Sequence, residues 1–489
     1  MTTMAFVKKI KRKKGKSYAI EVEGYRDKEG KVKHKYKRYL GTLDEKGNIL
    51  PSQKEINVDK VYQFGFPSIV AKAIEDLKLK DAAEDYEDEI AIMVLMQVCN
   101  PSSISKMMKR IIDIDPSLRD VDLPINRKRV ENVLDYLEEK KELIEENLYD
   151  NLKHLYAAET LFYDITSVAL HGYRSSLAKV GYPEFSPQIN IGLCIEAENG
   201  FPIFHEVFSG NIAHKSTLLQ IKHRLQIFER ENIVLIFDAG IAASEGLLQD
   251  AASMGFEVIS RVPMHENMKR LALENITKSF KDMTKLPSAK VYSKEIPRKK
   301  GKLLVCLNER TRLAVREKRY DEILDAIDRK KKGQKIKEGL KKYLIKEEGQ
   351  WRINYEAVEE AEKYDGIYVL SSSMKDMPKE DIVKAYFGRD RIEKCFSLMK
   401  GMLGIKPLRF QTDKRIRSRI MLCYLAYLIT TYIETKLKEN EREYTIEKTK
   451  EVLSNVYNVH LYRGDKHLKR MTSVNEEQKK IMDVFDLLS

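Results

Sequence analysis

The sequence predicts a mixed α/β protein in which a central sheet is flanked by a basic β-rich module and by helical segments. Three features predict this fold class. Polar and apolar residues alternate as in strands over the first 60 residues, helical periodicity begins near residue 61, and strand and helix patterns alternate from residue 159. With 489 residues, 43% of them hydrophobic, the chain is long enough for several domains with their own cores.

The amino-terminal third has two predicted parts. Residues 1–60 form a basic β-rich module, because two alternating basic segments flank an Asp-Lys-Glu-Gly turn signal at 27–30. Residues 61–155 form a helical domain, with a buried helix at 90–98 and an amphipathic helix at 130–148.

Residues 156–262 predict the first part of an α/β core. A Glu-Asn-Gly signal at 198–200 predicts a tight hairpin, and the continuous apolar run 233–237 is typical of a strand buried on both faces. The predicted order is strand 161–166, strand 189–195, strand 201–208, helix 216–229, strand 233–237, helix 244–255 and strand 256–262. Three antiparallel strands followed by helix, strand, helix and strand is the order of a ribonuclease-H-like core.

The second part of the core follows a break. Residues 263–365 are a basic mixture of strand and helix patterns, which predicts an insertion subdomain. The core resumes over 366–437 with a strand, one long helix from about Lys379 to Met399 and a second, apolar helix. Residues 438–489 are expected to form a helical C-terminal region.

Two aspartates accompany predicted core strands. Asp164 lies in the middle of the first strand and Asp238 directly follows the fourth, and these strands are neighbours in a ribonuclease-H-like sheet. A carboxylate in a strand needs a partner, and two that converge at the end of a sheet suit a hard divalent cation such as Mg²⁺. The alternatives are a cap for the following turn, above all for Asp238, or a partnered acid in the core.

The helix predicted at 379–399 has a polar face of mixed charge. Four residues share it: Tyr386, Arg389, Glu393 and Lys400. Spacings of three, four and seven residues bring side chains to one side of a helix. The buried stripe of the same helix consists of Ile392, Phe396 and Met399. The alternative is an ordinary surface ion pair between Arg389 and Glu393, four residues apart.

The net charge of +13 is unevenly distributed. Residues 1–40, 291–350 and 381–420 carry net charges of +10, +9 and +7, and the remainder sums to −13. Three basic surfaces on an otherwise acidic chain are typical of a protein that neutralises phosphates, and solubilising surfaces are the alternative.

Membrane and disulfide-rich classes do not fit the sequence. The first residues lack the apolar core of a signal peptide, and the longest apolar stretch, 420–433, is too short to span a bilayer. The five cysteines form no Cys-x-x-Cys pair, which predicts buried reduced thiols. We therefore expect a cytoplasmic protein without a membrane partner.

The polar helix face carries a family resemblance. The pattern Tyr-x2-Arg-x3-Glu-x6-Lys at 386–400 resembles the signature of a group of DDE transposases from prokaryotic insertion sequences. Other segments resemble the same family in the same order: FYDITS, PQINIGL with GFPIFHEVFSGN, IFDAGIAASEGL and YDGIYVLSSS. The similarity extends over residues 155–435.

The resemblance implies a function and a set of site residues. Asp164, Asp238 and Glu393 would be catalytic and would bind two Mg²⁺ or Mn²⁺ ions for DNA strand cleavage and strand transfer. Three signature residues would contact DNA: Tyr386, Arg389 and Lys400. The lone Trp351 would stack on a flipped base, although a lone tryptophan is more often part of a core.

The implied partners are double-stranded element ends with terminal inverted repeats, target DNA and a second copy of the chain in a synaptic homodimer. Two other functions stay open. One is a domesticated or inactive DNA-binding protein derived from a transposase, and the other is a different metal nuclease on the same fold.

Overall fold

The computed structural model describes most of the chain, which divides into two compact units. The first comprises Met1–Asp76, Ala91–Asn126 and Ile433–Ser489, and the second comprises Leu77–Ile90 and Arg127–Tyr432. The described residues are 5–12, 17–26, 29–51, 57–119, 125–155, 160–171, 174–181, 186–212, 214–228, 234–237, 253, 255–277, 284–286, 290–405, 410–463 and 466–488. Asp238 and most of the helix predicted at 244–255 lie outside them.

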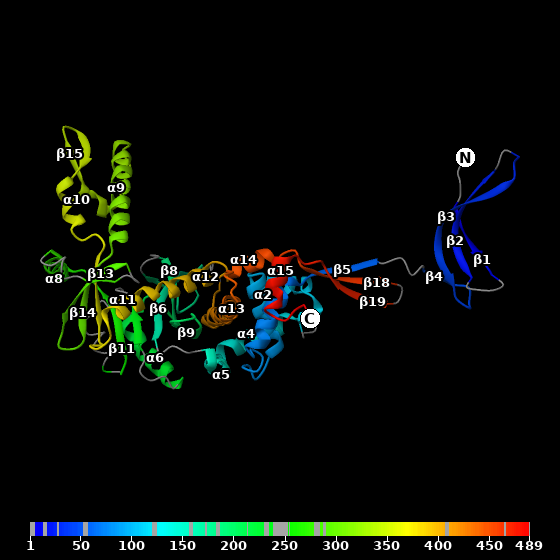
Figure 1. The fold of residues 1–489 in the computed structure, drawn as a ribbon, viewed down its shortest axis with the longest axis horizontal. Helices are drawn as coiled ribbons and strands as arrows, with labels where there is room; N and C mark the ends of the chain where they lie inside the picture. Colours follow the sequence, from blue (N-terminus) through cyan, green and yellow to red (C-terminus); the bar gives the residue numbers. More distant parts are fainter. Residues whose placement is uncertain are drawn as a thin grey trace. The chain divides into compact units, whose positions relative to one another are not determined.

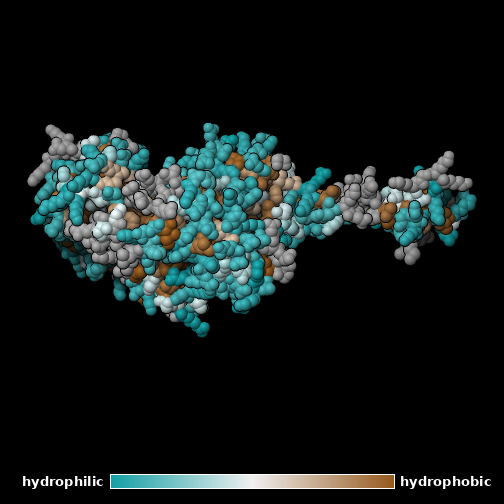
Figure 2. Space-filling view, turned by 90° about the horizontal axis from the view of Figure 1, so that it is seen from below, coloured by the Kyte–Doolittle hydropathy of each residue, from teal (hydrophilic) through white to brown (hydrophobic). Residues whose placement is uncertain are grey.

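The predicted β-rich module is an antiparallel sheet of four strands in the order β1-β2-β3-β4 (Figure 1). Its strands are β1 (Ala5–Ile10), β2 (Tyr18–Arg26), β3 (Val32–Leu43) and β4 (Ile49–Pro51). Many of its side chains are exposed, including the aromatic ring of Tyr36 on β3. Hydrophobic areas therefore appear beside hydrophilic ones on the surface of this module, at the right of Figure 2.

The rest of the first unit combines helices with a small sheet. The helices are α1 (Gly65–Asp76), part of α2 (Glu87–Cys99), α3 (Ile104–Arg110), α14 (Ile446–Val452) and α15 (Glu476–Asp483). The sheet contains β5 (Asn57–Gln63), β18 (Tyr457–Arg463) and β19 (Lys466–Met471) in the order β19-β18-β5.

Two sequence predictions about these helical regions need correction. The region 438–489 is not purely helical, because alternating residues on both sides of the Gly464-Asp465 pair form the antiparallel strands β18 and β19. The helical region 61–155 is divided between the two units. The helix predicted at 130–148 is also two helices, α4 (Arg127–Glu139) and α5 (Lys141–Asn151).

The second unit contains a mixed sheet of ten strands. Its order is β12-β13-β14-β17-β11-β10-β6-β8-β7, with β9 paired to β8. The five strands predicted for the core are β6 (Thr160–Ala169), β8 (Ser186–Glu196), β9 (Pro202–Ser209), β10 (Val234–Phe237) and β11 (Glu257–Val262). β6 pairs in parallel with β10 and antiparallel with β8, which confirms the expected contact between the first and fourth core strands.

The interval 263–365 has two structurally distinct parts. β12 (Thr284–Leu286), β13 (Val291–Pro297) and β14 (Lys302–Leu307) extend the core sheet, because β14 pairs with β17 (Ile367–Ser372). The remainder forms a separate hydrophobic cluster, whose helices and strands are drawn beside the sheet in Figure 1. This cluster is built from α9 (Glu309–Lys331), β15 (Leu344–Glu347), β16 (Gln350–Ile353) and α10 (Tyr355–Glu362). Only part of the interval is therefore an insertion outside the core sheet.

The helix predicted from Lys379 to Met399 is two consecutive helices, α11 (Lys379–Gly388) and α12 (Asp390–Lys400). The interruption falls at Arg389, whose N–H donates to Tyr386 O, and the Ile392 N–H donates to Arg389 O. Both are three-residue hydrogen bonds, which tighten the backbone locally. α11 contacts β11 and α12 contacts β6, so the two helices follow one another along the sheet (Figure 1).

The long helix α13 (Asp413–Glu439) is buried along its middle, from residue 418 to residue 431. The Tyr424 hydroxyl donates to the Ile203 carbonyl, which ties α13 to β9. None of the described helices has the length and apolar composition needed to cross a membrane. All five cysteines are buried and unpaired, as the sequence predicts.

Candidate active site

Asp164 is a partly exposed acid within an otherwise buried part of β6. Leu161, Phe162 and Tyr163 are almost fully buried, whereas the side chain of Asp164 is 15% exposed. The backbone N–H of Ile165 donates to Asp164 Oδ1 at 2.8 Å, which fixes one oxygen of the carboxylate. The second oxygen, Oδ2, faces a cation from a different part of the chain.

Glu393 is positioned by the apolar stripe of α12. Ile392, Phe396 and Met399 are buried, as predicted, and they hold the helix against the sheet. Glu393 lies in the first turn of α12, and its side chain is 52% exposed. The carboxylate is therefore held by a fixed helix but is accessible to solvent and ligands.

Arg389 connects the two carboxylates. Its Nη1 lies 3.5 Å from Asp164 Oδ2, and its Nη2 donates to Glu393 Oε1 at 2.5 Å. The guanidinium is only 14% exposed. Two acids that are far apart in the sequence therefore share one cation, so the pair of Arg389 and Glu393 is more than an isolated surface ion pair.

Tyr386 lies behind Arg389 and is buried. The guanidinium carbon of Arg389 is 5.7 Å from the centre of the Tyr386 ring, which suits a cation–π contact. The ring also stacks on Tyr368 of β17, with centroids 6.4 Å apart. These contacts make Tyr386 a support for the guanidinium, with its ring in the interior.

Lys400, at the opposite end of α12, also reaches β6. Its Nζ donates to the hydroxyl of Thr166, which is two residues after Asp164 and therefore on the same face of the strand. All four signature residues thus lie on the side of α11 and α12 that meets the sheet, and three of them bind one another or β6.

Three residues that sequence reasoning missed anchor α12. Arg391 donates to the carbonyls of Ala197 and Glu198 in the turn between β8 and β9. On α12, the Cys395 thiol is hydrogen-bonded to the Tyr427 hydroxyl, which donates to the Gly200 carbonyl. The sequence predicts the Glu-Asn-Gly turn. The contact of this turn with a helix about 190 residues later has no local sequence signal.

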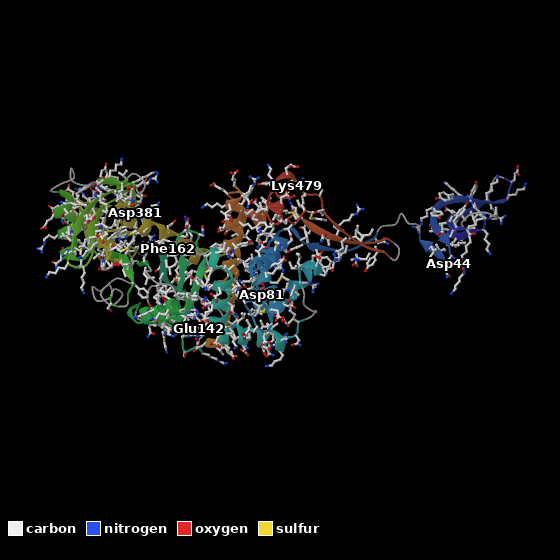
Figure 3. The ribbon with its side chains drawn as sticks, turned by 60° about the horizontal axis from the view of Figure 1, so that its bottom comes forward. Asp44, Asp81, Glu142, Phe162, Asp381 and Lys479 are labelled. Atoms are coloured by element: carbon white, nitrogen blue, oxygen red, sulfur yellow. The ribbon has the colours of Figure 1, made fainter. Side chains whose placement is uncertain are left out.

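Gly388 allows the junction of α11 and α12 to approach β6. A Cβ atom at this position would lie 2.7 Å from Cζ of Phe162, a buried ring labelled in Figure 3. Real Cβ atoms essentially never approach so closely. Glycine is therefore required for the close approach that brings Arg389 to Asp164.

The donors of this site fit a hard divalent cation. Asp164 and Glu393 offer carboxylate oxygens, and both already bind a positive group, the guanidinium of Arg389. Among the described residues, no three acids, histidines or cysteines gather as one metal site. Asp238, the third predicted ligand, is outside the described residues.

Trp351 lies in the separate cluster around α9. Among the described residues, no contact joins it to Asp164 or to α12. Its ring is partly buried against that cluster, and Lys330 Nζ is 5.2 Å from the ring centre. The indole is therefore only partly buried, and its contacts are those of a structural residue.

A second ionic cluster lies inside the second unit and does not include the signature residues. Glu145 of α5 and His205 of β9 are fully buried and hydrogen-bonded, with His205 Nδ1 2.7 Å from Glu145 Oε1. Arg224 of α6 (His214–Ile227) and Lys141 also bind this carboxylate. Burial raises the pKa of Glu145, but these cationic and hydrogen-bonding neighbours lower it to about 2.

Comparison with known proteins gives a family match. Residues 157–429, more than half of the chain, match the family described as "Transposase DDE domain". The chain belongs to this family. Family membership implies that this transposase acts on DNA and uses divalent metal ions.

A solved structure titled "Cryo-EM structure of piggyBac transposase synaptic complex with hairpin DNA (SNHP)" is also similar to the transposase. The sequence identity is 11% and the TM-score 0.38, with 81% of this chain and 82% of that chain covered. Comparison with curated protein sequences gave no match.

Proposed function

We propose that the chain is the transposase of a prokaryotic insertion sequence and belongs to the group with the Tyr-x2-Arg-x3-Glu-x6-Lys signature. It binds the terminal inverted repeats of its element, cleaves the DNA strands there and joins the free ends to target DNA. The observation that carries this proposal is the contact of one guanidinium, Arg389, with both Asp164 and Glu393.

Asp164, Asp238 and Glu393 are the proposed catalytic residues and the ligands of two Mg²⁺ or Mn²⁺ ions. The strand register supports including Asp238. Ile236 of β10 pairs with Phe162 of β6, and each proposed aspartate comes two residues after its member of this pair. Metal ions bound here would activate the attacking oxygen and stabilise the leaving oxygen of a phosphodiester.

The remaining signature residues bind and orient DNA. The guanidinium of Arg389 and the ammonium of Lys400 are donors suited to phosphate oxygens, and both already lie at the carboxylates or at β6. Tyr386 positions the guanidinium of Arg389 through the cation–π contact. The partly exposed Trp351 stacks on an unpaired base, if hairpin formation is part of the reaction.

The amino-terminal sheet supplies a surface for duplex DNA. β3 carries Lys33, Lys35, Lys37 and Arg38 on an exposed strand, interleaved with the exposed ring of Tyr36. Such a combination of cations and aromatic rings neutralises phosphates without base specificity. We propose that this module contacts the element ends, and that a homodimer holds two ends together in the cytoplasm.

A cleavage assay tests this function. The purified protein is incubated with plasmid DNA that carries the gene and its flanking sequences, in Mg²⁺ and in EDTA. We expect strand breaks at the ends of the inverted repeats only with Mg²⁺, and joined products in target DNA. Asp164→Asn and Asp238→Asn should remove the breaks while DNA binding persists.

The two alternative functions predict different results. A domesticated DNA-binding protein would bind the flanking repeats and leave them uncut in Mg²⁺. A different metal nuclease would cut without preference for the repeats and would form no joined product. Asp390→Asn serves as the control, because Asp390 lies on α12 with Glu393 but pairs with Lys394 in solvent. It should cleave like the wild type.

A further inference from the structure

The three-stranded sheet of β5, β18 and β19 has a basic face that the catalytic site does not explain. β18 is the central strand. The register sets Lys60, His460 and Lys469 opposite one another across the three strands. In the next row Tyr462 is opposite His467. Opposite residues in antiparallel strands, and residues two apart in one strand, point to the same face.

Aromatic rings form a continuous chain on this basic face, which consists of Lys60, Tyr62, His460, Tyr462, His467 and Lys469. Ring centroids are 4.7 Å apart for Tyr62 and His460, 4.9 Å for His460 and His467, and 5.1 Å for His467 and Tyr462. His460, between Tyr62 and His467, is buried, with Nε2 3.1 Å from Asp115 Oδ2, and this contact anchors the chain of rings. Tyr462, at one end of the chain of rings, is 44% exposed.

Cations border the rings on both sides. Lys60 Nζ is 4.9 Å from the centre of the Tyr62 ring and donates to the Ile112 carbonyl. Lys469 is exposed and has no ion-pair partner among the residues that the structure describes. By the strand register, Lys60 and Lys469 are both on the face that carries the rings, whereas Arg470 is on the opposite face. A positive potential is therefore expected along the rings.

The two faces of the sheet differ in chemistry. On the opposite face Val58 and Val61 are exposed and Arg470 is opposite Val459. A protein partner would gain most by covering exposed valines, because burial of apolar area is its main driving force. Aromatic rings interleaved with lysines match the sugar–phosphate backbone of a nucleic acid instead.

We propose that the basic face of this sheet is a further duplex-DNA contact surface of the transposase. It lies outside the three basic segments that the sequence indicates, 1–40, 291–350 and 381–420. The inference rests on the proposed function, because it assigns this surface to DNA that the transposase already holds. The contact is to phosphates and is independent of base sequence.

Salt-dependent binding by the full-length protein tests the proposal. The affinity for a fluorescein-labelled random-sequence duplex is measured by fluorescence anisotropy over a range of salt concentrations. Loss of one phosphate contact lowers the log–log salt slope by about 0.9, which is about an 8-fold weaker affinity at about 0.1 M salt. We expect Lys469→Ala to show this change.

Two matched controls are available. Arg470→Ala removes an exposed cation from the neighbouring residue on the opposite face, and Lys479→Ala removes one from α15, where Figure 3 labels it. Both should keep the wild-type affinity and salt slope. Thermal unfolding should be unchanged in all three variants, because exposed side chains are replaced.

The outcomes separate this inference from the proposed function. Equal effects of Lys469→Ala and Arg470→Ala, or a wild-type salt slope in Lys469→Ala, would overturn the assignment of the face. A changed oligomeric mass with unchanged DNA affinity would assign it to contacts between proteins and would also overturn it. A wild-type protein that binds no duplex would contradict the proposed function itself.

Discussion

Replacing Arg389 by glutamine should tighten the binding of divalent metal in the absence of DNA and at the same time weaken strand cleavage. The guanidinium contacts Asp164 Oδ2 at 3.5 Å and Glu393 Oε1 at 2.5 Å, so a metal ion must compete with it for both carboxylates. Glutamine is polar but carries no charge. When DNA is bound, the variant has no guanidinium to bind the phosphates, and strand cleavage therefore falls.

The expected size of the change in metal affinity follows from the exposure of the two carboxylates. A pair of charges 3.5 Å apart attract by about 5 kcal/mol at an effective dielectric constant of 20 and by about 1 kcal/mol in water. Glu393 is half exposed, so solvent screens its contact and the lower figure applies to it. A net competition of about 1–2 kcal/mol corresponds to metal binding about 5–30-fold tighter in the variant.

Isothermal titration calorimetry with Mn²⁺ and DNA-free protein measures this affinity directly. Lys394→Gln is the control, because Lys394 is a cation of the same helix that pairs only with Asp390 among the described residues, on the solvent side. Its metal affinity should equal that of the wild type. Unchanged or weaker Mn²⁺ binding by Arg389→Gln would refute the idea that the guanidinium occupies the carboxylates of the metal site.

Three further variants test the supports of the site. Gly388→Ala should lower the free energy of unfolding by about 1–3 kcal/mol, since the clash with Phe162 outweighs a helix-propensity gain of about 1 kcal/mol. Gly339→Ala is the control, because a Cβ atom at residue 339 would meet no neighbouring atom, and it should leave the stability unchanged. Thermal unfolding measures both variants. Arg391→Ala should release α12 from the β8–β9 turn and slow cleavage at saturating DNA, with partial rescue by lysine. Glu145→Gln should lower the free energy of unfolding, measured with urea at pH 7, by about 3–5 kcal/mol, because it leaves buried cations unpaired. The Glu145 pKa is lowered from 4.5 to about 2, so this stabilisation is complete above about pH 4.5 and is lost as the pH falls towards 2, where variant and wild type should converge.

Much of the core could be predicted from local patterns. The alternation around Asp164, the Glu-Asn-Gly turn and the apolar run at 233–237 each predict their element, and the strand order follows from them. The extension of the sheet by β12, β13 and β14 could not be predicted, because pairing of β14 with β17 joins strands about 60 residues apart without a local signal.

The site residues show the same limit. Helical spacing brought Arg389 and Glu393 to one face, but spacing alone treats Lys379 to Met399 as continuous. The break at Arg389 depends on tight backbone hydrogen bonds and on the approach of Gly388 to Phe162, which is a tertiary contact. The pairing of β18 and β19, by contrast, has a readable signal in the alternation of their residues and in the Gly-Asp pair of the sequence between them.

Cleavage by Glu393→Gln, compared with Asp390→Asn, tests the central claim most directly. Both changes neutralise an acid in the first turn of α12, but only Glu393 contacts the guanidinium that also holds Asp164. We predict that Glu393→Gln binds the element end like the wild type and makes no strand break in Mg²⁺, while Asp390→Asn cleaves normally. Wild-type cleavage by Glu393→Gln would contradict the assignment of Asp164 and Glu393 to one metal-dependent site.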